Sequence, residues 1–118
     1  MQGSIVWAQV ADQQGRNSKA RPAVIVTPTN EIVNNGQIVL VAVTSTLSPL
    51  PGNQVELPWK NEGHPVTGLK KRCVAICDWL VEINCNAIIR VAGVVPPDRL
   101  RMILANIPGD PGGINLPN

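Results

Sequence analysis

The sequence is poor in aromatic residues. Its 118 residues include no Phe, no Tyr and only three Trp, at positions 7, 59 and 79. A hydrophobic core must therefore consist of branched aliphatic side chains, which suit the 44% hydrophobic content and favour strands over helices. The 10 Gly and 11 Pro residues add many turns and leave little room for long helices. The composition thus predicts a mainly β chain.

Long apolar runs are also missing. No stretch approaches the roughly 20 apolar residues that a membrane-spanning helix requires. The segment Met1 to Gln14 has neither the basic start nor the apolar run that is typical of a signal peptide. We therefore expect a cytoplasmic protein with no membrane association.

Cysteine and histidine are scarce. The three cysteines, Cys73, Cys77 and Cys85, form an odd set without the pattern of a secreted disulfide scaffold. If Cys73 and Cys77 share a strand, they lie about 13 Å apart, too far for a disulfide. The one histidine, His64, and the lack of a Cys-x-x-Cys pair argue against zinc. We expect no metal and no other cofactor.

Positive and negative charges nearly balance, with 10 Lys and Arg residues and 8 Asp and Glu residues. The formal net charge of +2 is too small to indicate a nucleic-acid partner. The basic residues are nevertheless clustered, with Arg16, Lys19 and Arg21 in one group and 70–72 (Lys-Lys-Arg) in another. Two such clusters are either solvated loops or a surface for a polyanion.

The pattern of apolar and turn residues predicts five or six short strands, with Ala87–Val91 as the optional sixth. The expected strands are Ser4–Val10, Ala23–Thr27 (opened by Arg21-Pro22), Gln37–Thr44, Gln54–Leu57, Cys73–Val81 and Ala87–Val91. The unbroken apolar run in Ala23–Thr27 indicates burial on both faces of the sheet. We expect one helical turn within Pro28–Gly36, closed by an Asn35-Gly36 turn.

One helix is expected near the end of the chain. Leu100, Ile103, Leu104 and Ile107 form an apolar stripe, Pro97 suits the first helical position, and Pro108-Gly109 ends the helix. Residues 1–118 are expected to form one domain, with 108–118 as a loosely held tail. Five or six strands with one late helix predict a small, strongly bent barrel.

Several segments together resemble the MazF/PemK family of toxins. No single motif is specific, but the order and spacing of the segments over roughly residues 3 to 105 are. The matching segments are Gly3–Trp7, Lys19–Val26 with its Arg-Pro, Val41–Ser45 with its Thr-Ser, Val55–Leu57, Gly68-Leu69, Ala75–Asp78 and Arg90–Leu104.

The resemblance implies a fold and a function. The family fold is an SH3-like barrel. Members of the family form homodimers, cleave single-stranded RNA without metal, and are silenced by an antitoxin protein. The principal active-site residues of the family, the Arg of Arg-Pro and the Thr of Thr-Ser, correspond to Arg21 and Thr44. We expect these two residues to be catalytic.

The expected chemistry suits these side chains. Metal-independent RNA cleavage uses the 2'-hydroxyl as nucleophile, passes through a charged phosphorane, and leaves a 2',3'-cyclic phosphate. The Arg21 guanidinium would bind phosphate oxygens as a permanently charged fork, and Thr44 would donate a hydroxyl hydrogen bond. The loop Asp12 to Ala20 would lie over the substrate. Further RNA-binding residues are expected to be Arg16, Asn17, Lys19, Ser45 and Asp78.

The general base stays open at this point. Asp78 and His64 are both candidates. A structural hydrogen bond is the competing interpretation for Asp78, and a plain exposed loop histidine is the favoured interpretation for His64. Some PemK-type toxins carry a His in the first loop and an Arg two residues before the Asp. This sequence has neither, and Ile76 stands in the second place.

Two other functions fit the same expected fold. The chain could be a non-catalytic SH3-like module that binds RNA or protein, in which case RNA would remain uncut. It could also be a CcdB-like gyrase poison, which acts through its C-terminal helix. The Pro- and Gly-rich tail after Ile107 disfavours the gyrase hypothesis.

Overall fold

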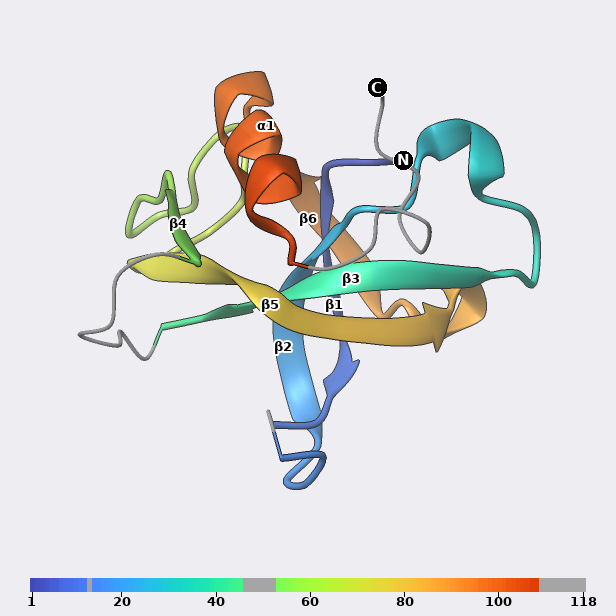
Figure 1. Ribbon diagram of the computed structural model, residues 1–118. Helices are drawn as coiled ribbons and strands as arrows, with labels where there is room; N and C mark the ends of the chain where they lie inside the picture. The colour runs from blue at the N-terminus through green and yellow to red at the C-terminus, as the bar shows by residue number, and fades with distance from the viewer. Residues whose placement is uncertain (13, 46–52, 109–118) are drawn as a thin grey trace.

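Six antiparallel strands form one curled sheet in the computed structural model, which describes residues 1–12, 14–45 and 53–108 (Figure 1). Their order across the sheet is β4-β5-β3-β2-β1-β6. The elements are β1 (Ser4–Val10), β2 (Lys19–Ile25), β3 (Gln37–Thr44), β4 (Gln54–Leu57), β5 (Cys73–Asn84), β6 (Arg90–Val94), helix α1 (Pro97–Asn106) and the 3-10 turns Thr29–Glu31 and Cys85–Ala87.

This architecture confirms the predicted mainly β fold with one C-terminal helix. The bounds of β1, β3 and β4 are those expected from the sequence. The helical turn in the Pro28–Gly36 connection is present, and Asn35 adopts the positive φ of 61° that its turn with Gly36 requires. Helix α1 begins at Pro97, as predicted, and ends one residue before Ile107.

The predicted bounds of three strands were wrong. Strand β2 ends at Ile25 rather than at Thr27. Strand β2 begins at Lys19 rather than Ala23, because backbone pairing with β1 continues through Pro22 to the Val10–Lys19 pair. Strand β5 continues past Val81 to Asn84, paired with β3. The last strand is Arg90–Val94 rather than Ala87–Val91, because Cys85–Ala87 form a 3-10 turn in which the Asn84 side chain accepts from the Asn86 amide.

Two hydrophobic clusters lie on opposite faces of β1, β2 and β3. The main core contains the buried residues Ile5, Val24, Val26, Val41, Val43, Val55, Leu57, Leu69, Cys73, Ala75, Cys77, Val95 and Ile103. The second core contains Val6, Ala8, Val10, Ala23, Ile25, Ile38, Leu40 and Ala42. Neighbouring residues of these strands point alternately into the two cores. This double burial explains their unbroken apolar runs.

A large bulge in β5 allows the sheet to curl. Two steps along β3, from Val41 to Val43, correspond to five steps along β5, from Leu80 to Ala75. Across the extra residues, the side of the sheet that alternate residues of β5 face is reversed. Cys77 therefore packs in the main core, whereas Trp79 packs against the second core. The first half of β5 and its partner β4 thereby fold over the main core.

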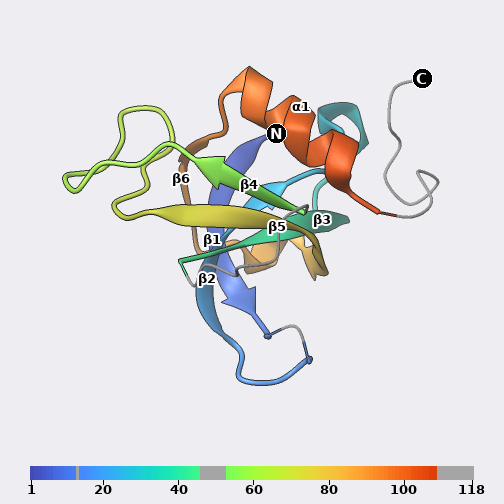
Figure 2. The ribbon, with the colours of Figure 1, turned by 60° about the vertical axis from the view of Figure 1, so that its left-hand side comes forward.

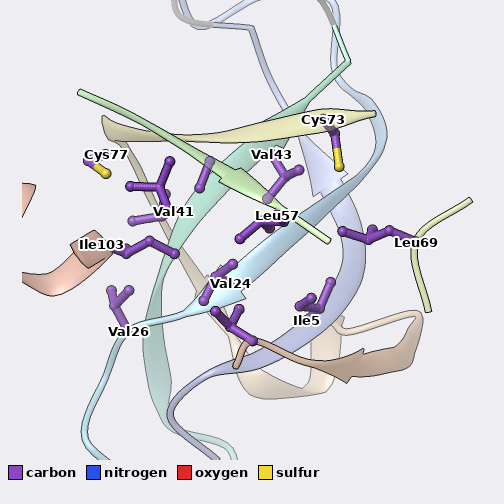
Figure 3. Close-up of a cluster of buried hydrophobic side chains, with 13 residues drawn as sticks. Ile5, Val24, Val26, Val41, Val43, Leu57, Leu69, Cys73, Cys77 and Ile103 are labelled. Carbon is purple, nitrogen blue, oxygen red and sulfur yellow. The ribbon is translucent and has the colours of Figure 1, made fainter. Parts of the chain in front are cut away.

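Helix α1 closes the main core. It packs against β4 and β5, and Ile103 is its buried residue (Figure 3). Figure 3 shows the Ile103 side chain entering the cluster from the helix, on the opposite side from Leu69. The partly buried residues Leu100, Leu104 and Ile107 pack on the same cluster, as their spacing predicts.

Some expectations fall outside the described residues. These are the tail beyond Pro108 and positions 46–52 of the loop after β3. In the part of the chain that is described, no helix combines the length and hydropathy needed to traverse a lipid bilayer.

Replacing Ile103 with Ala tests the role of the helix. Because Ile103 is fully buried, Ile103→Ala is expected to lower the free energy of unfolding by about 2–5 kcal/mol. The adjacent Met102 is 47% exposed, so Met102→Ala is the matched control and should change stability little. Urea denaturation followed by circular dichroism measures both. Equal effects of the two substitutions would show that α1 does not close the core.

Candidate active site

The site begins where β2 and β3 separate. These strands pair at Ala23–Ala42, Val24–Val41 and Ile25–Leu40. Continuing the same register by two residues would bring Arg21 opposite Thr44, but the strands have diverged there. Figures 1 and 2 show β2 running with β1 as a hairpin away from the end of β3. The predicted catalytic pair therefore lies on the two sides of an opening in the sheet.

A basic cleft of about 390 Å³ occupies this opening. Fourteen described residues line it, and they come from β1, β2, the end of β3, the loop before β5, the start of β5, and β6. Five of them are cationic, namely Lys19, Arg21, Lys70, Lys71 and Arg90, and none of the fourteen is acidic. The two basic clusters of the sequence thus meet at one cleft. We call it the basic cleft.

The loop before β5 carries Lys70 and Lys71 and forms one wall of the cleft. This wall packs directly against β6. Gly68 has a φ of 74°, and a Cβ there would lie 2.3 Å from the Ala92 carbonyl oxygen. A Cβ on Gly93 would lie 2.2 Å from the Val66 carbonyl oxygen. The Val94 amide also donates to that Val66 oxygen at 2.9 Å. Glycine is therefore required at both contacts for the wall to approach β6 so closely.

His64 holds the same wall together from inside. Its Nδ1 accepts hydrogen bonds from the Val66 amide at 3.1 Å and from the Thr67 amide at 3.4 Å. The buried Thr67 hydroxyl donates to the Pro58 carbonyl at 2.8 Å and accepts from the Leu69 amide. An Nδ1 that accepts two amides carries no proton, and His64 is not among the residues lining the cleft. The geometry favours the structural interpretation of His64.

Arg21 is fixed by two contacts on its own side of the sheet. Its Nε donates to the Val10 carbonyl at 3.1 Å, and its Cζ lies 5.3 Å from the centroid of the Trp79 ring. The ion pairs among the described residues are Arg72–Glu56 and Arg99–Asp98, so Arg21 is not neutralised by a carboxylate. One of its five N–H donors is used by Val10, which leaves the guanidinium able to bind an anion.

Asp12 organises the loop between β1 and β2. Its carboxylate accepts from the Gln14 amide, the Arg16 amide at 2.8 Å and the Asn17 side-chain amide at 2.9 Å. The Arg16 amide bond is the main reason that the pKa of Asp12 is lowered, and the charge of Arg21 contributes. The loop is therefore a turn built around one carboxylate, next to the start of β2.

The predicted site residues divide into two groups. Arg21, Thr44, Lys19 and Ser45 line the basic cleft. Arg16, Asn17 and Asp78 are exposed and do not line it. The Asn17 side chain is bonded to Asp12.

The position of Asp78 follows from the bulge. Asp78 lies within the extra residues of β5, between Ala75 and Leu80, where the strand exchanges its faces. Its carboxylate is exposed, and it contributes to the raised pKa of the neighbouring Cys77 thiol. The bulge therefore holds Asp78 outside the cleft of this chain.

Three residues of the site were missed by the sequence analysis. Trp7 and Arg90 both line the basic cleft, and the Arg90 Cζ lies 5.2 Å from the centroid of the Trp7 ring. Trp79 supports Arg21. The sequence signal that could have drawn attention to these residues is the small number of aromatic residues. Two of the three tryptophans lie next to an arginine in the folded chain.

The buried cysteines are poorly suited to react. Burial, with a smaller contribution from the charge of Glu56, raises the pKa of the Cys73 thiol to about 11. Burial likewise raises the pKa of Cys77 to about 11. Both thiols are therefore protonated near neutral pH. Among the described residues, no three His, Cys, Asp or Glu side chains are grouped to hold a metal ion.

The fold and the site define a small curled-sheet protein whose strand opening forms a cationic cleft. The family model of the PemK-like, MazF-like toxins of type II toxin–antitoxin systems matches residues 1–108. The chain therefore belongs to this toxin family, as its sequence segments predicted. A search among curated proteins found no match.

Solved structures of similar fold include several MazF toxins. The Mycobacterium tuberculosis toxin MazF-mt6 has 22% identity and a TM-score of 0.66, over 88% of this chain and 91% of that chain. MazF from Deinococcus radiodurans has 22% identity and a TM-score of 0.65, over 90% of each chain.

A third similar structure is an endoribonuclease in complex with its cognate antitoxin from Mycobacterial species. It has 18% identity and a TM-score of 0.65, over 100% of this chain and 97% of that chain. At these identities the three structures support the fold of the chain.

The Asp12 turn can be tested by acid titration. The pKa of Asp12 in the folded protein is lowered from its ordinary 3.8. The ionised carboxylate therefore contributes fully to the stability of the turn above pH 3.8, and this contribution is lost as the pH falls through the lower pKa of the folded state. The amide proton shifts of Gln14 and Arg16 should therefore titrate together, with a midpoint below pH 3.8. Asp12→Asn should abolish this titration. A midpoint at or above 3.8 would contradict the proposed turn.

Proposed function

We propose that this chain is an endoribonuclease that cleaves single-stranded RNA, with mRNA as the expected target, and acts as the toxin of a toxin–antitoxin pair. The observation that carries the proposal is the placement of Arg21 and Thr44 in one cleft with four further cations. Membership of the toxin family and the antitoxin complex of a structural neighbour support it. Cleavage would need no metal or cofactor and would leave 2',3'-cyclic phosphate and 5'-hydroxyl ends.

In the proposed reaction, the 2'-hydroxyl oxygen attacks the adjacent phosphorus, and the bond to the 5'-oxygen of the next nucleotide breaks. The attacking hydroxyl loses a proton, and the leaving oxygen gains one. Arg21 would neutralise the negative charge that develops on the phosphoryl oxygens, and Thr44 would donate a hydrogen bond to the same group.

Arg21 is prepared for this role before substrate binds. The Val10 carbonyl and the Trp79 ring already fix its orientation, so little reorganisation is needed in the transition state. None of the described residues lining the cleft is a His, Asp or Glu. The proposal therefore assigns charge stabilisation to Arg21 and Thr44 and assigns no general base.

The remaining parts of the proposal concern partners. A cognate antitoxin protein would bind the toxin and silence it, and two copies of this chain would form a homodimer that acts on cytoplasmic RNA. Lys19 and Ser45 would contact the RNA from the cleft. Arg16, Asn17 and Asp78 would contact it from outside the cleft.

Replacing Arg21 tests the catalytic assignment. Purified protein is incubated with a long RNA in EDTA, and the fragment ends are analysed. The native protein should give discrete fragments with cyclic-phosphate ends, and Arg21→Ala should cut about a hundred- to thousand-fold more slowly. Arg21→Lys should also be slow, because an ammonium lacks the bidentate fork.

Arg101→Ala is the matched control. Arg101 is exposed on α1, and its replacement gives the same net charge as Arg21→Ala. It should leave the cleavage rate unchanged. RNA that is bound but uncut under all conditions would favour a non-catalytic module, and inhibition of DNA supercoiling would favour a gyrase poison.

Thr44 tests the hydroxyl separately. Thr44→Val keeps the shape of the side chain and removes the hydroxyl, so it should reduce the turnover rate, with binding of an uncleavable oligonucleotide retained. Thr44→Ser keeps the hydroxyl and should restore most of the rate. Equal rates for the native, Val and Ser forms would remove Thr44 from the mechanism.

A further inference from the structure

A second set of residues lines the basic cleft in a row that includes Pro22, the neighbour of Arg21 in β2. Trp7 of β1 is directly opposite Pro22 of β2 and directly opposite Arg90 of β6. Directly opposite residues in a sheet point to the same face. Pro22, Trp7 and Arg90 therefore form one row across three strands, and all three line the cleft.

The row ends in an aromatic–cation pair that is open to solvent on one side. The Arg90 Cζ lies 5.2 Å from the centroid of the half-buried Trp7 ring, and Arg90 itself is exposed. Arg90 is at the edge of the sheet because β6 pairs with β1 alone. Neither of the two ion pairs among the described residues involves Arg90, so its charge is not neutralised by an acid.

We propose that Trp7 and Arg90 form a nucleobase-binding subsite for single-stranded nucleic acid, beside the phosphate site at Arg21 and Thr44. An unpaired base would stack against the indole and guanidinium, and Arg90 would also attract the adjoining phosphate. Lys70 and Lys71, on the neighbouring wall, would follow the backbone between the two sites. This inference rests on the proposed function and extends it to substrate positioning.

The chemistry of the subsite sets its specificity. Stacking on an aromatic ring accepts every base, because each base has a π-face. The subsite would therefore add affinity and fix the strand in the cleft, whereas choice of sequence would come from other contacts. Because one base would be held here, the effect of an abasic site that depends on Trp7 should appear at one position of the strand only.

The test uses a short mixed-sequence 2'-O-methyl RNA, which lacks the attacking hydroxyl and cannot be cut. Binding by the native protein is measured by fluorescence anisotropy with the intact strand and with single abasic positions. One abasic position should weaken binding about 5- to 140-fold. In Trp7→Leu, that position should lose its effect, and Trp7→Phe should be intermediate.

Salt dependence separates the two residues. Arg90→Gln should reduce the slope of log affinity against log salt by about 0.7, the value for one phosphate contact on a single strand. Trp7→Leu should weaken binding with no change in slope. Arg101→Gln, which alters the net charge equally on α1, should leave the slope unchanged.

The outcomes distinguish the subsite from the nuclease. If RNA is cut but the abasic profile is the same in native protein and Trp7→Leu, the subsite is refuted and the nuclease stands. If Trp7-dependent binding occurs without any cleavage, the nuclease is refuted and the subsite stands. A strand that fails to bind at any salt concentration refutes the subsite, and uncut RNA with the same protein refutes the nuclease as well. Because Trp7→Leu changes a half-buried residue, its folding is checked by thermal melting, and the exposed Arg90→Gln provides the independent result.

Discussion

The separation of β2 from β3 is the constraint on which the site depends. The two strands are held together by Ala23, Val24 and Ile25, whose side chains are buried on both faces of the sheet. Two residues earlier, β2 follows β1 instead and leaves β3. A closed sheet would have placed Arg21 and Thr44 side by side on a paired ladder, with no space for a phosphate between their strands. The opening turns two ordinary strand positions into the two sides of a cleft.

The cleft brings together cationic residues that are far apart in the sequence. Five cations from three segments border one opening, although the net charge of the whole chain is only +2. Exposed charges interact over about 8–10 Å at physiological salt, so these cations act together on a ligand that enters the cleft. The acidic residues are elsewhere, as with Glu56, which pairs with Arg72 at 2.9 Å. Placement of charge rather than its sum therefore makes the surface suitable for RNA.

The sequence allowed the fold class to be predicted, and it singled out Arg21 and Thr44, which line one cleft, because both inferences depend on local patterns and on segment order. The bounds of β1, β3 and β4 followed from alternation and from Pro, Gly and Asn turns. The start of β2 could not be predicted in the same way, because backbone pairing through Pro22 depends on β1. The bulge of β5, which decides the faces of Cys77, Asp78 and Trp79, likewise depends on pairing with β3.

The cleft residues that escaped prediction share one physical reason. Arg90 reaches the cleft only because β6 pairs with β1 in a register that sets it opposite Trp7. Long-range register of this kind leaves no mark on the local sequence. His64 shows the converse, since a titratable side chain in a basic loop suggested chemistry and instead binds two backbone amides.

The stacking of Arg21 on Trp79 links folding to function. Trp79 packs against the second core, and the guanidinium that would bind phosphate lies on its ring. Repacking of the second core, by heat or by a distant substitution, would tilt the Trp79 indole and displace the Arg21 guanidinium. Under the proposed function, the second core would therefore influence the orientation of Arg21 from outside the basic cleft.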